Sequence, residues 1–467
     1  MPPFFTTADL TDQLATGIAS TAPWGTGSKT KGLDFVPYTL TRFNGGPRLC
    51  GLPHPYAYCK LVEAITIHWN EVQTSMLSQS SEIVAKEHKD GRIFIMDYDS
   101  QFTRSKTYLN KQASAKFVAR ADISNFYPSI YTHSIGWAVA GIQAAKSNSN
   151  GSIWYNKLDS RVRDCKRQET NGLIIGPGTS SIVSEIILCR IDRILEARGY
   201  SFQRFIDDYT CFCMSRADAE AFINELEREL GRFSLYLNFR KTSVGPHDGI
   251  ELPQWIPNLG VSSLGDTPSF FDIKLYLSRA LALSEEYPDH SVLRYAIHAL
   301  SGRNYNRQSG EYLLRMLLAL CLRHQHLIGS IQPYLNFGND SNGNFLYSQE
   351  LTALAEVAAN SARSDAVCWA IQLHSMVKLN VTKDISSKII LSYDPCAIAM
   401  LYVNTDAQSK RTITRYVKKS ILPRSEAIQR NWFLVHFLLD RGVLKISEVS
   451  DATLVYIKKN ALRFYKI

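Results

Sequence analysis

The chain has 467 residues, of which 45% are hydrophobic and 20% are charged. This composition is typical of a globular protein and excludes a disordered or fibrous chain. The chain is long enough for two or three domains. The formal net charge of +9 at pH 7 favours a polyanionic partner, although mildly basic globular proteins are common.

The beginning of the chain shows no basic segment followed by an apolar core, so no signal peptide is predicted. The longest apolar runs, such as residues 316–322 (MLLALCL), are too short to span a bilayer. Nine cysteines occur without a CxxC pair, which indicates reduced structural thiols and argues against a zinc site. We therefore expect a cytoplasmic protein without a membrane partner.

The first half of the chain alternates helical and strand-like patterns. Apolar residues recur at helical spacing over residues 56–72, and residues 117–123 (FVARADI) are strand-like until Pro128 interrupts the pattern. A glycine-rich stretch, residues 172–181 (GLIIGPGTSS), then leads into a predicted helix over residues 181–199. That helix ends on a glycine, as helices commonly do.

A predicted hairpin over residues 202–213 (FQRFIDDYTCFC) comes next. Residues 218–233 have the pattern of an amphipathic helix, and residues 235–245 that of a strand with a basic end. Residues 100–250 therefore mix strands and helices, which indicates a mixed α/β layer.

After about Asp266 only helical patterns of comparable strength remain. They cover residues 270–283, 311–328, 351–377 and 429–442. No strict repeat period is visible, although an irregular helical array fits the pattern. The predicted fold class is α/β plus all-α, divided into residues 1–100, 101–260 and 261–467.

Two adjacent aspartates, Asp207 and Asp208, lie within the aromatic hairpin. Two carboxylates about 4 Å apart repel by roughly 4 kcal/mol at an effective dielectric near 20. Asp122, at the end of the strand-like run, supplies a third carboxylate. Three such groups can hold two Mg²⁺ ions, or Mn²⁺, for phosphoryl transfer, and the cations would remove the repulsion.

The same segments resemble the motifs of reverse transcriptases, in the same order and with matching spacing. Residues 122–130 (DISNFYPSI) are similar to motif A and residues 172–181 to motif B. Residues 205–208 (FIDD) are similar to motif C, and residues 237–242 (LNFRKT) to motif D. The resemblance implies fingers within residues 1–100 and a palm, an antiparallel sheet with helices, within residues 101–260.

The family pattern also implies roles for the carboxylates and their neighbours. Asp122 and Asp207 would be the principal metal ligands, with Asp208 as a supporting carboxylate. Ile123 is included among the metal-binding and nucleotide-binding positions. Lys241 would lie near the leaving pyrophosphate, where a general acid helps.

Three further positions are nucleotide-binding candidates by this resemblance. The ring of Tyr127 would fill the space of a 2′-hydroxyl and select dNTPs, although it could also be an ordinary strand aromatic. Arg48 resembles the fingers arginine that grips the triphosphate, with a surface arginine as the alternative. Gly176 would let the backbone approach nucleic acid closely.

Four cations precede motif A and could contact backbone phosphates, although a solvated face is the alternative for each. They are Lys106, Lys111, Lys116 and Arg120.

Motif B departs from the family pattern. Most reverse transcriptases have Pro-Gln-Gly where this chain has Ile174, Ile175 and Gly176. The missing glutamine usually lies near nucleotide and template, so ordinary templated copying is in question.

The motif A segment, the Gly-Pro-x-x-Ser of motif B and the long helical half resemble one subgroup of reverse transcriptases. This subgroup is the abortive-infection (Abi-type) bacterial reverse transcriptases of phage defence, which includes prophage-encoded members. This resemblance implies a bacterial cytoplasmic homo-oligomer with a HEAT-like helical domain in place of a thumb. It also implies extension of single-stranded DNA without a template, in some members from a protein hydroxyl, which leaves a covalent DNA–protein adduct. RNA is a further partner.

Three functions are weighed. The first is a Mg²⁺-dependent DNA polymerase of antiphage defence. The second is a conventional RNA-templated reverse transcriptase of retron or group II intron kind. The third is a non-catalytic nucleic-acid-binding scaffold, which retention of the three aspartates, Tyr127 and Lys241 disfavours.

Overall fold

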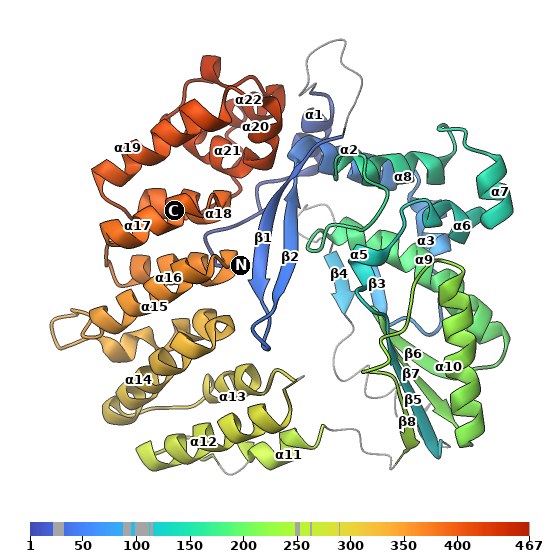
Figure 1. The fold of residues 1–467 in the computed structure, drawn as a ribbon, viewed down its shortest axis with the longest axis horizontal. Coiled ribbons are helices and arrows are strands. Elements are labelled where there is room, and N and C mark those ends of the chain that lie inside the picture. Colours follow the sequence, from blue (N-terminus) through green and yellow to red (C-terminus); the bar gives the residue numbers. More distant parts are fainter. Residues whose placement is uncertain are drawn as a thin grey trace.

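The computed structural model divides into a mixed α/β half and a helical half (Figure 1). It describes residues 1–21, 32–86, 95–98, 112, 115–247, 253–261, 264–288 and 290–466. No helix in these ranges is both long enough and apolar enough to cross a membrane.

The palm is built on a four-stranded antiparallel sheet with the strand order β6-β7-β5-β8. Its strands are β5 (Phe117–Asp122), β6 (Phe202–Phe205), β7 (Asp208–Cys213) and β8 (Ser243–Pro246). The long helix α9 (Gly178–Ala197) and α10 (Arg216–Gly231) complete this layer. The predicted antiparallel sheet with helices is confirmed.

Smaller elements surround the sheet. The helices are α3 (Trp69–Ser75), α5 (Phe126–Ser129), α6 (Ser134–Ala140), α7 (Ile142–Ser147) and α8 (Trp154–Asp164). A second hairpin pairs β3 (Ile83–Lys86) with β4 (Ile95–Tyr98).

The C-terminal half contains helices and no strand within its described residues, as predicted. Its first members are α11 (Trp255–Leu259), α12 (Phe270–Glu286), α13 (Val292–Leu300), α14 (Arg307–Arg323), the 3₁₀ segment η2 (Gln325–Gly338), α15 (Ser348–Ser361) and α16 (Ser364–Met376). Its last members are α17 (Lys383–Leu391), α18 (Pro395–Val403), α19 (Ala407–Tyr416), the π-helical η3 (Val417–Ile421), α20 (Ser425–Arg430), α21 (Trp432–Asp440), η4 (Ile446–Glu448) and α22 (Ala452–Lys459). A HEAT-like repeat stays a prediction.

The N-terminal region packs in the core of the helical half. This region comprises α1 (Asp12–Ala19) and a hairpin of β1 (Phe35–Thr41) with β2 (Pro47–Pro53). Val36 and Tyr38 of β1 are buried in the same apolar cluster as α16, α18 and α21. The termini also meet, because Phe5 pairs with Tyr465 in an antiparallel bridge.

Helix α2 (Pro55–Ile67) joins the two halves. Ala57, Leu61 and Ile65 belong to the palm core, whereas Cys59 belongs to the core of the helical half. At its start, the buried His54 imidazole lies 3.1 Å from the Asp451 carboxylate of the helical half. The two halves therefore share a helix and a buried hydrogen bond.

Several predicted elements differ from the structure. The helix over residues 56–72 is broken at His68 into α2 and α3, and the one over residues 351–377 at Ala362 into α15 and α16. The predicted strand over residues 235–245 is wrong, because only β8 is extended. Before β8 the chain makes only a single bridge, between Leu237 and Ile123 just after β5, and then turns, since the Lys241 main-chain N–H donates to the Asn238 carbonyl at 2.9 Å.

Candidate active site

Three aspartates meet where strands β5 and β7 lie side by side. Asp122 is the last residue of β5, and its partner in the antiparallel register is Asp208, the first residue of β7. Asp207 lies in the turn before β7, and its carbonyl accepts the Ile123 main-chain N–H at 3.3 Å. The structure thus brings together carboxylates that are 85 residues apart in the chain.

The turn that holds Asp207 has a strained backbone. Ile206 has a φ of +58°, a left-handed conformation that a β-branched side chain disfavours. The Ile206 carbonyl accepts a hydrogen bond of 2.9 Å from Nη1 of Arg204. This bond and the one from Ile123 fix the turn on both sides of the Ile206–Asp207 peptide.

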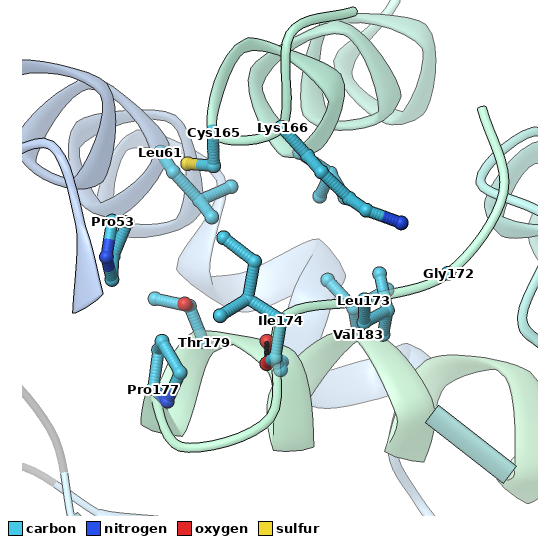
Figure 2. Close-up of a pocket in the computed structure, with 12 residues that line it drawn as sticks. Pro53, Leu61, Cys165, Lys166, Gly172, Leu173, Ile174, Pro177, Thr179 and Val183 are labelled. Atoms are coloured by element: carbon cyan, nitrogen blue, oxygen red, sulfur yellow. Dashed lines mark hydrogen bonds between the residues drawn. The ribbon is translucent and has the colours of Figure 1, made fainter. Parts of the chain in front are cut away.

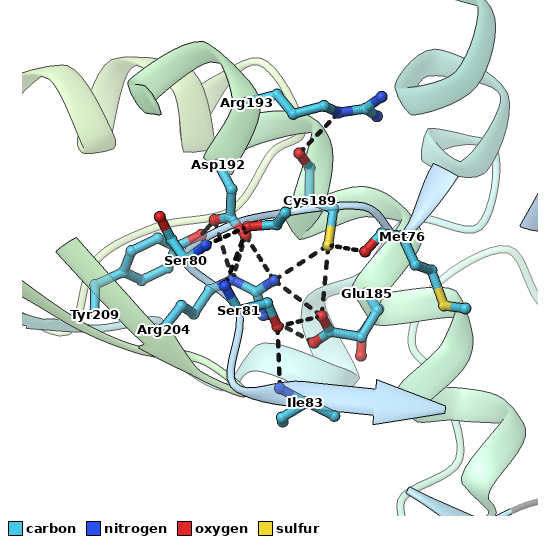
Figure 3. Close-up of polar contacts among 12 residues, drawn as sticks. Met76, Ser80, Ser81, Ile83, Glu185, Cys189, Asp192, Arg193, Arg204 and Tyr209 are labelled. Atoms are coloured by element: carbon cyan, nitrogen blue, oxygen red, sulfur yellow. Dashed lines mark hydrogen bonds and ion pairs between the residues drawn. The ribbon is translucent and has the colours of Figure 1, made fainter. Parts of the chain in front are cut away.

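Arg204 is itself held in a buried ionic cluster (Figure 3). Its guanidinium, which is 0% exposed, donates to Glu185 at 2.8 and 2.9 Å and to Asp192 at 2.7 to 3.0 Å. Both acids come from α9, while the Tyr209 hydroxyl on β7 donates to Asp192 at 3.1 Å. Ser81, which precedes β3, donates to Glu185 at 2.8 Å. The cluster therefore ties the hairpin to α9.

Sequence reasoning missed this cluster. A usable signal exists, because Glu185 and Asp192 are seven residues apart with the apolar residues 186–189 between them. That spacing places both acids on the same helix face, and an arginine between the aromatic residues of the neighbouring strand supplies the opposite charge.

Two residues of the segment after α10 hold the Asp122 carboxylate. Nζ of Lys241 donates to Oδ2 at 2.8 Å, and Nδ2 of Asn238 donates to Oδ1 at 3.0 Å. Asn238 was not singled out from the sequence, although it lies within motif D. The turn that replaces the predicted strand is what brings both side chains to Asp122.

The aspartates lack full charge compensation. Burial raises the pKa of Asp207, and the Asp122 charge adds to this, while Lys241 and Arg48 oppose it. Burial and the charges of Asp207 and Asp122 raise the pKa of Asp208 to about 7. Burial works against protonation of Lys241, but its hydrogen bond to Asp122 and the three carboxylate charges raise its pKa overall.

The carboxylate oxygens of the three aspartates are the kind of ligand that a hard divalent cation prefers. Carboxylate oxygens suit Mg²⁺, and the raised pKa values of Asp207 and Asp208 show an unmet demand for positive charge. Both Asp122 oxygens are engaged by Lys241 and Asn238. Within the residues that the structure describes, no set of three or more His, Cys, Asp or Glu side chains is arranged to hold a metal ion.

Tyr127 lies on the short helix α5, which comes soon after Asp122 in the chain. Its hydroxyl lies 3.2 Å from Oγ of Ser181 on α9, and its ring centroid is 5.1 Å from that of Phe126. The ring is therefore fixed between motif A and the helix of motif B. Ser181 belongs to the motif B segment and was not assigned a role from the sequence.

The motif B loop is shaped by close packing (Figure 2). The Ile174 side chain is buried and points between Leu61 of α2 and Cys165, which follows α8. A Cβ on Gly172 would lie 2.8 Å from the Pro128 carbonyl oxygen, and its φ is +82°. Ile174, at the position of the family's proline, is thus part of the core, and Ile175 occupies the position of the glutamine.

The next residues of the loop face a cleft. Ile175 accepts a hydrogen bond of 3.0 Å from the Gly51 main-chain N–H of β2. Ile175 and Gly176 line a cleft of about 830 Å³ between this loop, the β1–β2 hairpin and Trp432. Gly176 is exposed with a φ of +126°. The backbone at Gly176 is therefore open to a ligand.

Arg48 and Ile123 occupy different settings. Arg48 is an exposed residue of β2 whose charge is felt at Asp207. The Ile123 side chain is only 1% exposed, so its main chain is the part that could reach a ligand. Lys116 and Arg120 lie in or just before β5 with exposed side chains, whereas Lys106 and Lys111 lie outside the described residues.

Comparison with known protein families finds a match over part of the chain. Residues 44–254 match the family described as reverse transcriptase (RNA-dependent DNA polymerase). This range includes all the candidate site residues, and such domains carry out nucleotidyl transfer with divalent metal ions. No curated protein matches the chain.

Solved telomerase structures are similar at low scores. Apo telomerase from Candida tropicalis has a TM-score of 0.36 and 10% identity over 77% of this chain and 72% of its own. Telomerase from Candida albicans, in a complex with a fragment of telomeric RNA, has a TM-score of 0.33 and 9% identity over 83% of this chain and 66% of its own. These scores are too low to support an inference about this chain.

Replacing Arg204 with Met is expected to destabilise the fold by about 3–5 kcal/mol, because Glu185 and Asp192 would lose their buried counter-charge. Adding Glu185→Gln and Asp192→Asn to Arg204→Met should recover part of the loss. The measurement is the free energy of unfolding in denaturant. Arg216→Met is the matched control, because its pair with Glu220 is exposed on both sides. Equal losses for Arg204→Met and Arg216→Met would contradict a structural role for the cluster.

The raised pKa of Asp208 predicts a pH dependence of stability. Its ordinary value is about 3.9, so between about pH 4 and pH 7 the folded state binds more protons than the unfolded state. The folding free energy from this group therefore becomes less favourable as pH rises through that window. We expect Asp208→Asn to raise the melting temperature at pH 8 and to have little effect at pH 4.

The control for this measurement is Asp9→Asn, an exposed aspartate of the N-terminal segment. Mg²⁺ should also raise the melting temperature of the wild type at pH 8, and by less in Asp208→Asn. A pH profile of Asp208→Asn that runs parallel to the wild type would exclude the raised pKa.

Proposed function

We propose that this chain is a DNA polymerase of antiphage defence that adds dNTPs through its reverse transcriptase domain without copying a template. The observation that carries the chemistry is the meeting of Asp122, Asp207 and Asp208 at neighbouring strand ends. A scaffold that only binds nucleic acid gains nothing from carboxylates that repel one another.

Each side chain has a role in this proposal. Asp122, Asp207 and Asp208, with the Ile123 main chain, would hold two Mg²⁺ ions. When bound, these ions supply positive charge for phosphoryl transfer. Arg48 would bind the triphosphate, which agrees with its exposed side chain and its electrostatic effect on Asp207. Lys241, with its raised pKa, would remain protonated and give a proton to the leaving pyrophosphate.

Template-free synthesis is supported by motif B. Ile174 is packed in the core and Ile175 lines the cleft with an aliphatic side chain, so neither offers an amide to a base pair. Protein priming, a covalent DNA–protein adduct, a homo-oligomer and a bacterial cytoplasmic setting belong to the same proposal through the Abi-type motifs. A conventional RNA-templated reverse transcriptase is the second candidate, favoured by the family matched over residues 44–254.

The decisive assay incubates the purified full chain with Mg²⁺ and each dNTP, with and without an RNA template and primer. We expect product without template, and loss of product to background in Asp207→Asn. The matched control is Asp266→Asn, whose side chain is 97% exposed. Product that requires template supports the second candidate. A folded wild type that makes no product with Mg²⁺ or Mn²⁺ excludes both enzymes.

The defence role is tested in cells with the same pair of variants. Bacteria that express the wild type or Asp266→Asn should resist a sensitive phage, whereas those with Asp207→Asn should not. Equal plating of phage on all three strains would remove antiphage defence from the proposal while leaving the polymerase assay unaffected.

Sugar selection depends on the ring of Tyr127. We expect Tyr127→Ala to raise the use of ribonucleotides relative to deoxynucleotides by about tenfold, or about 1.4 kcal/mol of discrimination, because the ring no longer fills the space of a 2′-hydroxyl. Tyr127→Phe is the matched control, since it keeps the ring and removes the hydroxyl that contacts Ser181. An unchanged ratio in Tyr127→Ala, measured with matched rNTP and dNTP, would show that another residue selects the sugar.

A further inference from the structure

A basic groove lies on the helical half, on the far side of that half from the palm. It is lined by Tyr402 of α18 and by side chains of α19 and η3, and it encloses about 440 Å³. The lining residues on α19 and η3 are Lys410, Arg411, Thr414, Arg415, Lys418 and Lys419. Figure 1 shows α19 at the outer edge of the helical half, away from the palm sheet. The groove is therefore separate from the three aspartates.

The charged residues of this groove are close together in the chain, and all of them are positive. Residues 407–424 contain six Lys or Arg and no Asp or Glu, whereas the formal net charge of the whole chain is +9. Most cationic surfaces are interspersed with acids, which shortens the reach of their field. This segment thus supplies two thirds of the formal excess of positive charge.

Few of these cations have acidic partners. Lys418 pairs with Glu448 at 2.6 Å. Arg411, Arg415 and Lys419 are exposed and form no ion pair with any described residue of the structure. Arg411 and Arg415 are four residues apart on one face of α19, and Lys419 continues that line by four more. The arrangement is a row of cations about one helical turn apart.

An aromatic ring forms part of the same surface. Nζ of Lys410 lies 5.7 Å from the centroid of the Tyr402 ring, which lines the groove. Tyr393, which is 58% exposed, packs at 5.4 Å from Tyr416 on the neighbouring face of α19. A cationic groove that follows a backbone, with aromatic rings on which bases stack, is how proteins bind single strands without sequence preference.

We propose that this groove binds single-stranded nucleic acid, with the row of cations on successive phosphates and Tyr402 against a base. The ligand is identified by its phosphate spacing and exposed bases, which DNA and RNA share. The identity of the natural strand, a DNA product of the palm, rests on the proposed function, whereas the groove itself does not.

The test measures binding of fluorescently labelled dT and rU oligonucleotides, and of a duplex, to the full chain by anisotropy at several salt concentrations. The variant is Arg411→Gln/Arg415→Gln/Lys419→Gln. Losing three phosphate contacts should weaken single-strand binding at least tenfold near 150 mM salt and make the slope of log K against log salt shallower by about 2. Comparing the dT and rU arms shows which sugar the groove prefers.

A matched triple variant, Lys274→Gln/Arg279→Gln/Arg323→Gln, removes three exposed cations elsewhere on the helical half and should bind like the wild type. Tyr402→Ala should weaken binding at least fivefold without changing the salt slope. In wild type, an oligonucleotide with 5-bromouracil should crosslink by light to the peptide that contains Tyr402.

Several results would overturn the proposal. They are unchanged affinity and slope in the groove triple variant, crosslinks confined to palm peptides, or a duplex that binds as tightly as the single strand. A groove triple variant that changes only the oligomeric state would identify the surface as a contact between copies instead. If the wild type incorporates dNTPs but the groove variants bind normally, only this inference fails. If the groove binds but no dNTP is incorporated, only the proposed function fails.

Discussion

The buried guanidinium of Arg204 is the interaction on which the palm depends. It donates hydrogen bonds to Glu185, to Asp192 and to the carbonyl of the strained Ile206, and so fixes the turn that carries Asp207. A buried charge without partners would be very costly. Here all three guanidinium nitrogens donate hydrogen bonds to acceptors. One side chain thereby connects motif C with the helix of motif B.

Two charge environments lie a few residues apart in this hairpin. Around Arg204 one buried guanidinium hydrogen-bonds to two buried acids, which suits a rigid support. Around Asp207 and Asp208 negative charge exceeds positive charge, and Lys241 and Arg48 compensate only in part. The rigid cluster holds in place carboxylates that would otherwise move apart, which is how local strain persists at functional sites.

Sequence patterns predicted the parts of the fold that have local signals. The helix beginning near Ser181, the hairpin around Asp207 and the helical half all follow periodicity or motif order. The strand over residues 235–245 was wrongly predicted because a turn interrupts its apolar alternation, closed by the bond from the Lys241 main-chain N–H to the Asn238 carbonyl. Packing of Tyr38 against the helical half carries no local signal, since its partners are more than 300 residues away. Arg204 and its acids were missed although they lie only 12 and 19 residues apart, because their pairing depends on how the hairpin packs against α9.

The β1–β2 hairpin gives the helical half a mechanical connection to the active site. Its strand β1 is buried in the helical core, whereas its strand β2 carries Arg48 and bonds to Ile175 of motif B. A thumb that pivots on one linker can open without disturbing the fingers. Here any rotation of the helical half would carry the hairpin with it and change the distance between Arg48 and Asp207. Events on the helical surface, including capture of a strand, would thus act as a gate on the triphosphate position.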